Sequence, residues 1–330
     1  EIKIYFSDFS SDFSIRDDIF YRWLASRYTL IIDPIKPDYL VYSCYGTDYL
    51  KYNDCIRIFY TAENIRPDFN VCDYAIGFDF MEYGDRYYRF PNYARYGEQF
   101  ELLTSPRSYA SNLITQKKGF CNFIYSNSFA DPARDEFFHL LSRYKKVDSL
   151  GAHLKNTEIP ISERYAKDWR TSKVEIQKEY KFSITFENSF APGYTTEKML
   201  HALISNTIPI YWGNPLVDRD FNPNCFINCH HFKSWNDVVE TVIEIDSNQE
   251  RYLEMINQPP FVNNQVPENL KNETLVQFFA NVFEQPLDKA FRRPQYGTTS
   301  MYERKINNLV ELERRFNWMN QFINKLKRYV

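Results

Sequence analysis

The chain lacks three features that would each point to a class of function. Its formal net charge is -3 over 330 residues, so no overall positive field favours nucleic acid as a partner. No run of residues approaches the roughly 20 apolar residues that cross a membrane, and no signal peptide is visible. These absences favour a cytoplasmic protein.

The chain also lacks a Cys-x-x-Cys pair. Cys225 and Cys229, followed by His230 and His231, could suggest zinc, but no second pair of ligands is near in the sequence. Most of the six cysteines lie in apolar, strand-like runs, where free thiols pack as small hydrophobic groups. A reducing compartment is favoured over a disulfide scaffold. The cysteines are Cys44, Cys55, Cys72, Cys121, Cys225 and Cys229.

Apolar and polar segments alternate along most of the chain. Hydrophobic residues make up 44% of the sequence, which suffices for globular cores, and 330 residues suggest two domains. Short apolar runs alternate with helical patterns, as in parallel α/β sheets. A polar stretch, 93–117, separates two such sets. Strands are predicted at 2–6, 28–33, 39–44, 55–60, 73–78, 120–126, 147–150, 182–186 and 208–212, and helices at 17–26, 132–144, within 162–180, and at 234–245 and 275–283.

The stretch from Tyr180 to Pro215 reads YKFSITFENSFAPGYTTEKMLHALISNTIPIYWGNP. It predicts a strand, a polar loop, a helix capped by Thr195 or Thr196, and a second strand. Ligands bind open α/β sheets at the carboxyl ends of strands, and a helix start there favours phosphate. This segment is therefore the predicted binding edge.

Four polar residues crowd that loop and helix start. Lys198 offers a point charge to a diphosphate, and Glu197 can accept hydrogen bonds from sugar hydroxyls. Asn188 and Tyr194 can donate or accept, and the ring of Tyr194 can close over a base or a sugar. Each residue alone would be read as an ordinary turn or solvated helix start. Together they indicate a sugar-nucleotide site.

The words FEN, GYTTEK and IPIYWG in this stretch resemble the α-1,3/4-fucosyltransferases of glycosyltransferase family 10, in particular the bacterial members of the Helicobacter type. The likeness extends to FYTAENIRPDFNVCDYAIGFDF (59–80) and, more loosely, to FIYSNSFADPARDEFFHLL (123–141). It implies a GT-B fold, with two Rossmann-like domains facing a cleft. The implied ranges are 1–115 for the acceptor domain, 116–290 for the GDP-fucose domain and 291–330 for a basic amphipathic helical tail.

The resemblance also implies the reaction. Family members invert configuration in one displacement, so a base for the acceptor hydroxyl is needed and a protein nucleophile is not. The proposed base of the family lies in a YTGEN word, and this chain has YTAEN, which makes Glu63 the predicted catalytic base. Ala62 replaces the glycine. Taken alone, Glu63 would be read as a surface loop residue.

Three cations are candidates for the donor diphosphate. Lys198 is the first, and Lys155 is the second, because relatives carry an Arg-Asn pair where this chain has Lys155-Asn156. Lysine keeps the charge but loses the bidentate fork. Arg134 is a third candidate, although a helix-surface salt bridge with Asp131 or Glu136 is the preferred interpretation.

The remaining donor contacts are carried over from the family. Tyr60 is expected to reach phosphate or fucose, and Asn188, Tyr194 and Glu197 are expected to line fucose and ribose. The resemblance implies no metal and no cofactor, although divalent ions could stimulate the enzyme. The only literal Asp-x-Asp word, residues 218–220, is predicted to be a solvated loop.

The predicted function is transfer of L-fucose from GDP-fucose to the 3-hydroxyl of GlcNAc in N-acetyllactosamine-type glycans, as in Lewis x-like lipopolysaccharide O-antigens. An α-1,4 linkage, glucose or another acceptor, and a non-catalytic glycan-binding protein stay open as alternatives.

The tail has a helical apolar pattern of its own. Between residues 301 and 330, seven Lys and Arg residues stand against three Glu residues. Three interpretations stay open: a coiled-coil homodimer, a peripheral contact with the inner face of the inner membrane, and a helix packed on its own domain. The seam consists of Leu309, Leu312, Phe316, Met319, Ile323, Leu326 and Val330.

Overall fold

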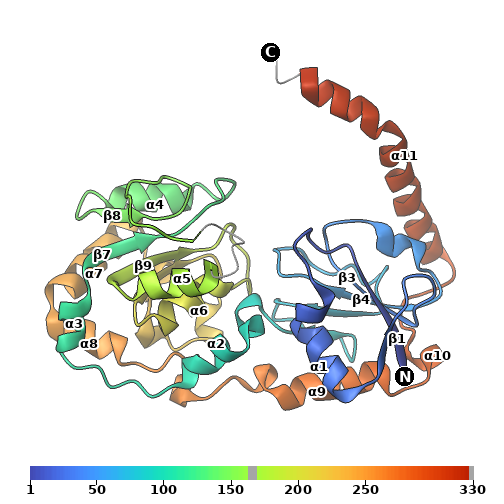
Figure 1. The fold of residues 1–330 in the computed structure, drawn as a ribbon, viewed down its shortest axis with the longest axis horizontal. Coiled ribbons are helices and arrows are strands. Elements are labelled where there is room, and N and C mark those ends of the chain that lie inside the picture. Colours follow the sequence, from blue (N-terminus) through green and yellow to red (C-terminus); the bar gives the residue numbers. More distant parts are fainter. Residues whose placement is uncertain (163–168, 327–330) are drawn as a thin grey trace. The chain divides into compact units, whose positions relative to one another are not determined.

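The structure is a computed structural model that describes residues 1–162 and 169–326. The chain folds into two compact units. The colours of Figure 1 follow the sequence and show which parts of the chain each unit takes. Unit 1 consists of Glu1–Gly77, Met81–Tyr88 and the residues from Leu275 onward, and unit 2 consists of Phe78–Phe80 and Arg89–Thr274. These units do not follow the predicted ranges 1–115, 116–290 and 291–330. The assignment of acceptor and donor binding to those ranges stays a prediction.

Six strands form the first sheet, in the order β2-β1-β3-β4-β5-β6. Strands β1 to β5 pair in parallel, with Ile4 opposite Tyr39 and Ile58 opposite Tyr74. β3 and β4 are buried throughout, as expected for short apolar runs in the middle of a parallel sheet. The strands are β1 (Ile2–Ser7), β2 (Leu30–Ile32), β3 (Tyr39–Tyr42), β4 (Ile56–Tyr60), β5 (Tyr74–Gly77) and β6 (Tyr87–Arg89).

Aromatic rings join the helices of unit 1 to its sheet. Helix α1 (Ile19–Arg27) begins after Asp18, whose side chain accepts the N–H groups of Phe20 and Tyr21. The ring of Phe20 meets Tyr60 of β4 edge-on at 4.6 Å. Helix α9 (Asn272–Phe283) adds Phe279, whose ring lies 5.8 Å from that of Phe20. Helix α9, from the C-terminal part of the chain, thus packs into the core formed by the N-terminal part.

Buried charges anchor the C-terminal segment, which includes α10 (Leu287–Ala290) and α11 (Thr298–Leu326), to the first sheet. The Asp73 carboxylate, fully buried, accepts the backbone N–H groups of Arg292 and Arg293 at 2.8 Å and pairs with the Arg293 guanidinium. The Arg57 guanidinium, also fully buried, lies 2.6 Å from a carboxylate oxygen of Glu303 in α11. The segment is therefore an integral part of unit 1.

Beyond this anchor, α11 presents apolar side chains to solvent. Leu309 is 67% exposed, and Leu312, Phe316 and Met319 are also exposed. A surface ion pair joins Arg314 to Asp48. The rest of the predicted seam, Ile323, Leu326 and Val330, lies outside the residues whose side chains are described, as do Lys325, Lys327 and Arg328.

Five strands form the sheet of unit 2, in the order β11-β10-β9-β7-β8, and all neighbours are parallel. β9 and β10 run side by side with Phe186 opposite Trp212, so both end at one edge. This is the strand–helix–strand unit predicted from the sequence. The strands are β7 (Gly119–Phe123), β8 (Val147–Ser149), β9 (Tyr180–Phe186), β10 (Ile208–Trp212) and β11 (Ile227–Asn228).

Helices connect these strands, as in other parallel sheets. Helix α7 begins with a capping box between Ser234 and Asp237, and Asn248 caps α8. Helix α8 was not predicted, and residues 163–168 of the predicted helix within 162–180 lie outside the described part of the chain. The helices are α2 (Glu98–Glu101), α3 (Asn112–Gln116), α4 (Ala133–Leu141), α5 (Trp169–Gln177), α6 (Glu197–Ile204), α7 (Trp235–Ser247) and α8 (Gln249–Ile256).

All six cysteines are free thiols, and five of them are buried. Burial raises the pKa of the Cys55 thiol to about 11, so this group is a neutral packing residue. No helix within the described residues is both long and apolar enough to cross a membrane.

Candidate functional site

Glu187 occupies the centre of the carboxyl edge of the sheet in unit 2. It follows β9 directly, and its side chain is fully buried. One carboxylate oxygen accepts the backbone N–H of Thr196 at 2.7 Å. The other accepts the Thr196 hydroxyl at 2.7 Å and the Lys198 ammonium at 3.0 Å. Thr196 is the N-cap residue of α6, as predicted, but its side chain accepts no N–H of the first turn and donates to Glu187 instead.

Two carboxyl groups and two amino groups gather around the start of α6. Besides Glu187 and Lys198, they are Glu197 and Lys173 of α5, whose ammonium lies 3.9 Å from a Glu197 oxygen. Burial raises the pKa of Glu187, and Lys198 offsets part of this rise. Burial acts on Glu197 in the same direction, but Lys198 and Lys173 outweigh it and hold the pKa of Glu197 well below its ordinary range. Glu197 is thus ionised and accepts hydrogen bonds only.

Tyr194 and Asn188 lie in the loop between β9 and α6. Tyr194 is only 4% exposed, and its ring meets that of Phe78 edge-on at 5.1 Å. Asn188 is half-buried, and its backbone carbonyl accepts the N–H of Asp131 at 2.8 Å. Tyr194 is therefore a packed wall residue of the loop, whereas Asn188 is partly open to solvent.

Lys155 lies in the loop after β8, and its side chain is 50% exposed. The next residue, Asn156, fixes this loop to the strand. Its side-chain oxygen accepts the N–H of Ser149 at 2.8 Å, and its amide donates to the carbonyl of Val147 at 2.9 Å. Lys155 is thus a half-exposed cation, and Asn156 fixes the loop that carries it to the end of β8.

Arg134, near the start of α4, is only 1% exposed. Its guanidinium bonds to Asp135 at 3.2 Å and lies 4.7 Å from the ring centre of Tyr125. Its Nη1 has no hydrogen-bond partner among the residues that the structure describes. Asp135 in turn pairs with His153 at 2.7 Å, in the loop that carries Lys155. The preferred interpretation, a helix-surface salt bridge with Asp131 or Glu136, is wrong, because Arg134 is buried and its partner is Asp135.

Glu63 and Tyr60 belong to unit 1, at the carboxyl end of β4. Glu63 is half-buried, and its carboxylate accepts the hydroxyl of Tyr45, which follows the neighbouring strand β3, at 2.6 Å. The Thr61 hydroxyl accepts the N–H of Glu63 at 3.0 Å and so orders the turn. Tyr60 is only 2% exposed and packs against Phe20. Glu63 is thus the partly open carboxylate of this strand end, and Tyr60 lies in the core beneath it.

The structure therefore brings Glu197 and Lys198 together at one helix start, with Asn188 and Tyr194 in the loop before it. Lys155 and Arg134 follow β8 and β7 of the same sheet. Two members of the charge cluster, Glu187 and Lys173, were missed. Glu187 could have been found, because it stands within the FEN word directly after the strand, whereas Lys173 carries no signal in its sequence context.

Within the Asp-x-Asp word, Asp220 is buried, which corrects the prediction of a solvated loop at this residue. Asp220 is 4% exposed and forms a two-pronged ion pair with Arg89 at 2.9 and 2.6 Å. Asp218 bonds to His231 at 2.6 Å. Within residues 1–162 and 169–326, no group of three His, Cys, Asp or Glu side chains is arranged to hold a metal.

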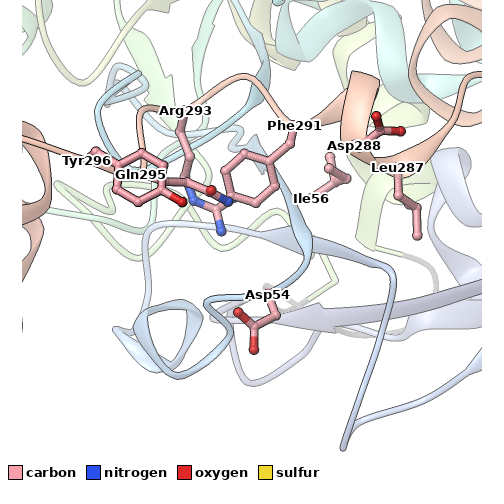
Figure 2. A pocket seen from close by; sticks show the side chains of 8 residues that line it. All are labelled: Asp54, Ile56, Leu287, Asp288, Phe291, Arg293, Gln295 and Tyr296. Atoms are coloured by element: carbon pink, nitrogen blue, oxygen red, sulfur yellow. The ribbon is translucent and has the colours of Figure 1, made fainter.

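A pocket of about 520 Å³ lies elsewhere in unit 1, at the amino end of β4 (Figure 2). Ile56 of β4 and Asp54, two residues before it, line one side of the pocket, and Leu287 and Asp288 of α10 line it from the C-terminal segment. Ligands of parallel sheets bind at the carboxyl edge, where Glu63 lies, so this pocket is not the candidate site.

Two family descriptions match the chain. The N-terminal domain of α-(1,3)-fucosyltransferase FucT matches residues 4–96, and the C-terminal domain of glycosyltransferase family 10 (fucosyltransferase) matches residues 114–274. The chain belongs to glycosyltransferase family 10. The α-(1,3)-fucosyltransferase FucT of Helicobacter pylori is 30% identical to this family-10 chain over 317 residues, which is 82% of this chain and 62% of the relative. The chain thus spans less than two thirds of that relative.

The fold comparison agrees with this family. A crystal structure of an α1,3-fucosyltransferase with GDP-fucose matches with a TM-score of 0.72 at 27% identity, over 89% of this chain and 93% of that one. A crystal structure of an α1,3-fucosyltransferase with GDP matches equally well, at 28% identity over 86% of this chain and 90% of that one. The predicted fold class, α/β and GT-B with a C-terminal helix, is confirmed.

Proposed function

We propose that this family-10 chain transfers L-fucose from GDP-fucose to the 3-hydroxyl of GlcNAc in N-acetyllactosamine-type glycans, giving a Lewis x-like product such as that of a lipopolysaccharide O-antigen. The observation that carries the proposal is the Lys198 ammonium at the start of α6, held 3.0 Å from Glu187, with Glu197 as the preceding residue, at the carboxyl edge of a parallel sheet. A helix start with a cation suits a diphosphate, and an ionised carboxylate suits sugar hydroxyls. A structural relative of the same family is described with GDP-fucose.

In this proposal the donor contacts come mostly from unit 2. Lys198 and Lys155 neutralise the diphosphate, helped by the N–H groups of the first turn of α6. Glu197 and Asn188 bind the hydroxyl groups of fucose and ribose, and Tyr194 forms a wall of the site. Arg134 supports the phosphates from beneath the loop after β7, and Tyr60 is the donor contact from unit 1.

The mechanism is a single inverting displacement. Glu63 accepts the proton of the acceptor hydroxyl as its oxygen forms a bond to the anomeric carbon of fucose. The bond from that carbon to the β-phosphate oxygen breaks at the same time, and GDP leaves with the electron pair. Side chains and a helix start neutralise the leaving group, so the reaction requires no metal and no cofactor. Stimulation by divalent ions is compatible with this scheme.

The acceptor is the less constrained half of the proposal. An α-1,4 linkage, or transfer to glucose or another acceptor, would use the same donor residues. A glycan-binding protein without turnover is the alternative from another class. The retained Glu63, Glu197 and Lys198 argue against it.

A GDP-release assay with GDP-fucose tests the proposal. N-acetyllactosamine, lacto-N-biose and lactose are compared side by side, each with and without EDTA. We expect release that depends on N-acetyllactosamine and survives EDTA. A preference for lacto-N-biose or lactose would favour the alternative linkages. GDP binding without release for any of the three would favour the glycan-binding protein.

The tail extends the proposal to location and assembly. The exposed apolar side chains of α11 and its basic residues suit a homodimer or a peripheral contact with the inner face of the inner membrane, in a cytoplasmic protein. Replacing Leu312 and Met319 with Ser would lower the mass in sedimentation if α11 pairs with a second copy. Replacing Arg314 and Arg315 with Gln would instead reduce binding to anionic vesicles if it lies on a membrane.

A further inference from the structure

We propose that Glu187 is a positioning residue for the donor diphosphate, which acts by fixing the Lys198 ammonium and the first turn of α6. The proposal rests on the proposed function, because it takes Lys198 to be the diphosphate cation. Nothing in the roles carried over from the family assigns Glu187.

Three donors converge on this carboxylate. They are the N–H of Thr196, the hydroxyl of Thr196 and the ammonium of Lys198, at 2.7, 2.7 and 3.0 Å. The Thr196 hydroxyl has a second contact, because its oxygen lies 2.9 Å from the same ammonium. The hydroxyl therefore donates to Glu187 and accepts from Lys198, which closes a three-membered ring of contacts. Protein groups thus contact the Lys198 ammonium on two sides.

Only a carboxylate satisfies this arrangement. A carboxylate accepts at both oxygens, whereas an amide has one acceptor oxygen and one donating NH₂ group. In Glu187→Gln, the NH₂ group would face either the N–H of Thr196 or the ammonium of Lys198. At least one donor would lose its acceptor in either orientation, and a buried donor without a partner is costly.

The side chain of Glu187 fits because Gly213, which lies beside it, has no side chain. The N–H of Glu187 donates to the carbonyl of Trp212 at 2.9 Å, which brings the two strand ends together. A Cβ on Gly213 would lie 2.6 Å from the Cβ of Glu187, and the φ of Gly213 is +139°. Glycine is therefore required for the carboxylate to occupy this slot.

The charge of Glu187 also decides where Lys198 points. Lys198 is close enough to Glu197 to lower the pKa of that carboxyl. Without the negative charge on Glu187, Glu197 would be the stronger attraction for the ammonium. Lys198 would then turn from the diphosphate towards the carboxylate that is proposed to bind sugar hydroxyls. Glu187 thus keeps the phosphate contact and the sugar contact apart.

The test is the dissociation constant of GDP, measured by calorimetry for the whole chain. Glu187→Gln should weaken GDP binding by about tenfold or more, the loss of a hydrogen bond to a charged group. Glu175→Gln, the same change at an exposed residue of α5 that pairs with Lys178, is the matched control and should not move the constant. Equal constants for Glu187→Gln and the wild type would overturn the proposal.

A double-mutant cycle separates positioning from a general structural role. If Glu187 acts through Lys198, adding Glu187→Gln to Lys198→Ala should weaken GDP binding by less than about twofold. An undiminished tenfold effect in the Lys198→Ala background would overturn the proposal. Because Glu187→Gln could fail to fold, Thr196→Val and Thr196→Ser provide a second comparison. The valine variant, which lacks the bridging hydroxyl, should bind GDP at least about threefold more weakly than the serine variant, and equal affinities would contradict the ring of contacts.

Failure of the proposed function would look different. A wild-type chain that does not bind GDP would remove the donor assignment. The coupling of Glu187 to Lys198 would then be measured as the interaction term in the free energy of unfolding of the same variants. A coupling below about 0.5 kcal/mol would overturn the contact itself.

Discussion

The substitution Asp73→Asn should lower the free energy needed to open unit 1, although it replaces no side chain of the candidate site. The carboxylate of Asp73 accepts four donors: the N–H groups of Arg57, Arg292 and Arg293, each at 2.8 Å, and the guanidinium of Arg293. An asparagine side chain has one acceptor oxygen and keeps at most one pair of these. Two of the four donors would lose their acceptor, and the Arg293 cation would lose its counter-charge.

The magnitude follows from these losses. An unsatisfied buried donor costs about 1–3 kcal/mol, and breaking a buried ion pair costs about 3–5 kcal/mol. Because the two overlap at Arg293, we expect Asp73→Asn to lower the opening free energy of unit 1 by about 4 kcal/mol. That is a large part of the roughly 5–15 kcal/mol that stabilises a typical domain.

Hydrogen exchange resolved to peptides from β4 and β5 measures this opening separately from unit 2. Asp288→Asn, at an exposed carboxylate on α10, is the control and should stay within about 0.5 kcal/mol of the wild type. A change of less than about 1 kcal/mol in Asp73→Asn would refute the reasoning. It would mean that the C-terminal segment is held by its apolar contacts alone.

Three further predictions concern the two strand edges. Glu63→Gln should lower kcat by about 10²-fold and leave the dissociation constant of GDP unchanged if Glu63 is the base; a near-normal kcat would remove it from that role. Burial lowers the pKa of His230 from its usual 6.5 to about 4, and its ring nitrogen accepts the N–H of Gly213. Neutral His230 thus stabilises the fold fully above pH 6.5, and about 1–2 kcal/mol, allowing for its partial exposure, should be lost as the pH falls towards 4. In urea titrations at several pH values, His230→Gln should show a smaller loss, and an equal loss would contradict this. Gly213→Ala should cost about 2–4 kcal/mol, because strain at positive φ adds to a clash with Glu187. Gly84→Ala, at a positive φ in open space, should cost only the strain, about 1 kcal/mol, and equal costs would exclude the clash.

The sequence predicted the parts of the fold that are encoded locally. Short apolar runs such as 56–60 and 182–186 are strands, because a buried parallel strand needs only a few consecutive apolar residues. Because the strands before and after them were predicted in this way, the loop and helix start that carry Glu197 and Lys198 were also correctly predicted to lie at the carboxyl edge of the sheet. Residue roles within the site were carried over from the family and stay predictions.

What was missed depends on contacts between residues that are distant in the chain. Arg134 looks like a surface residue in its own helix, and only the packing of α4 on Tyr125 shows that it is buried. Asp220 lies in a polar stretch of sequence, yet it is buried because it forms an ion pair with Arg89. The return of the C-terminal segment to unit 1 has no local pattern, because the ion pair of Asp73 with Arg293 joins residues that are 220 positions apart.

The ion pairs that join the C-terminal segment to the first sheet also determine the order in which the two units can fold during synthesis. Asp73 and Arg57 leave the ribosome early, but Arg293 and Glu303 follow only after all of Arg89–Thr274 has been made. Unit 2 is nearly continuous in sequence and can close as soon as it emerges. The half of the molecule that is synthesised first is therefore completed last, and a chain that stops before Arg293 carries a finished second unit behind an unfinished first one.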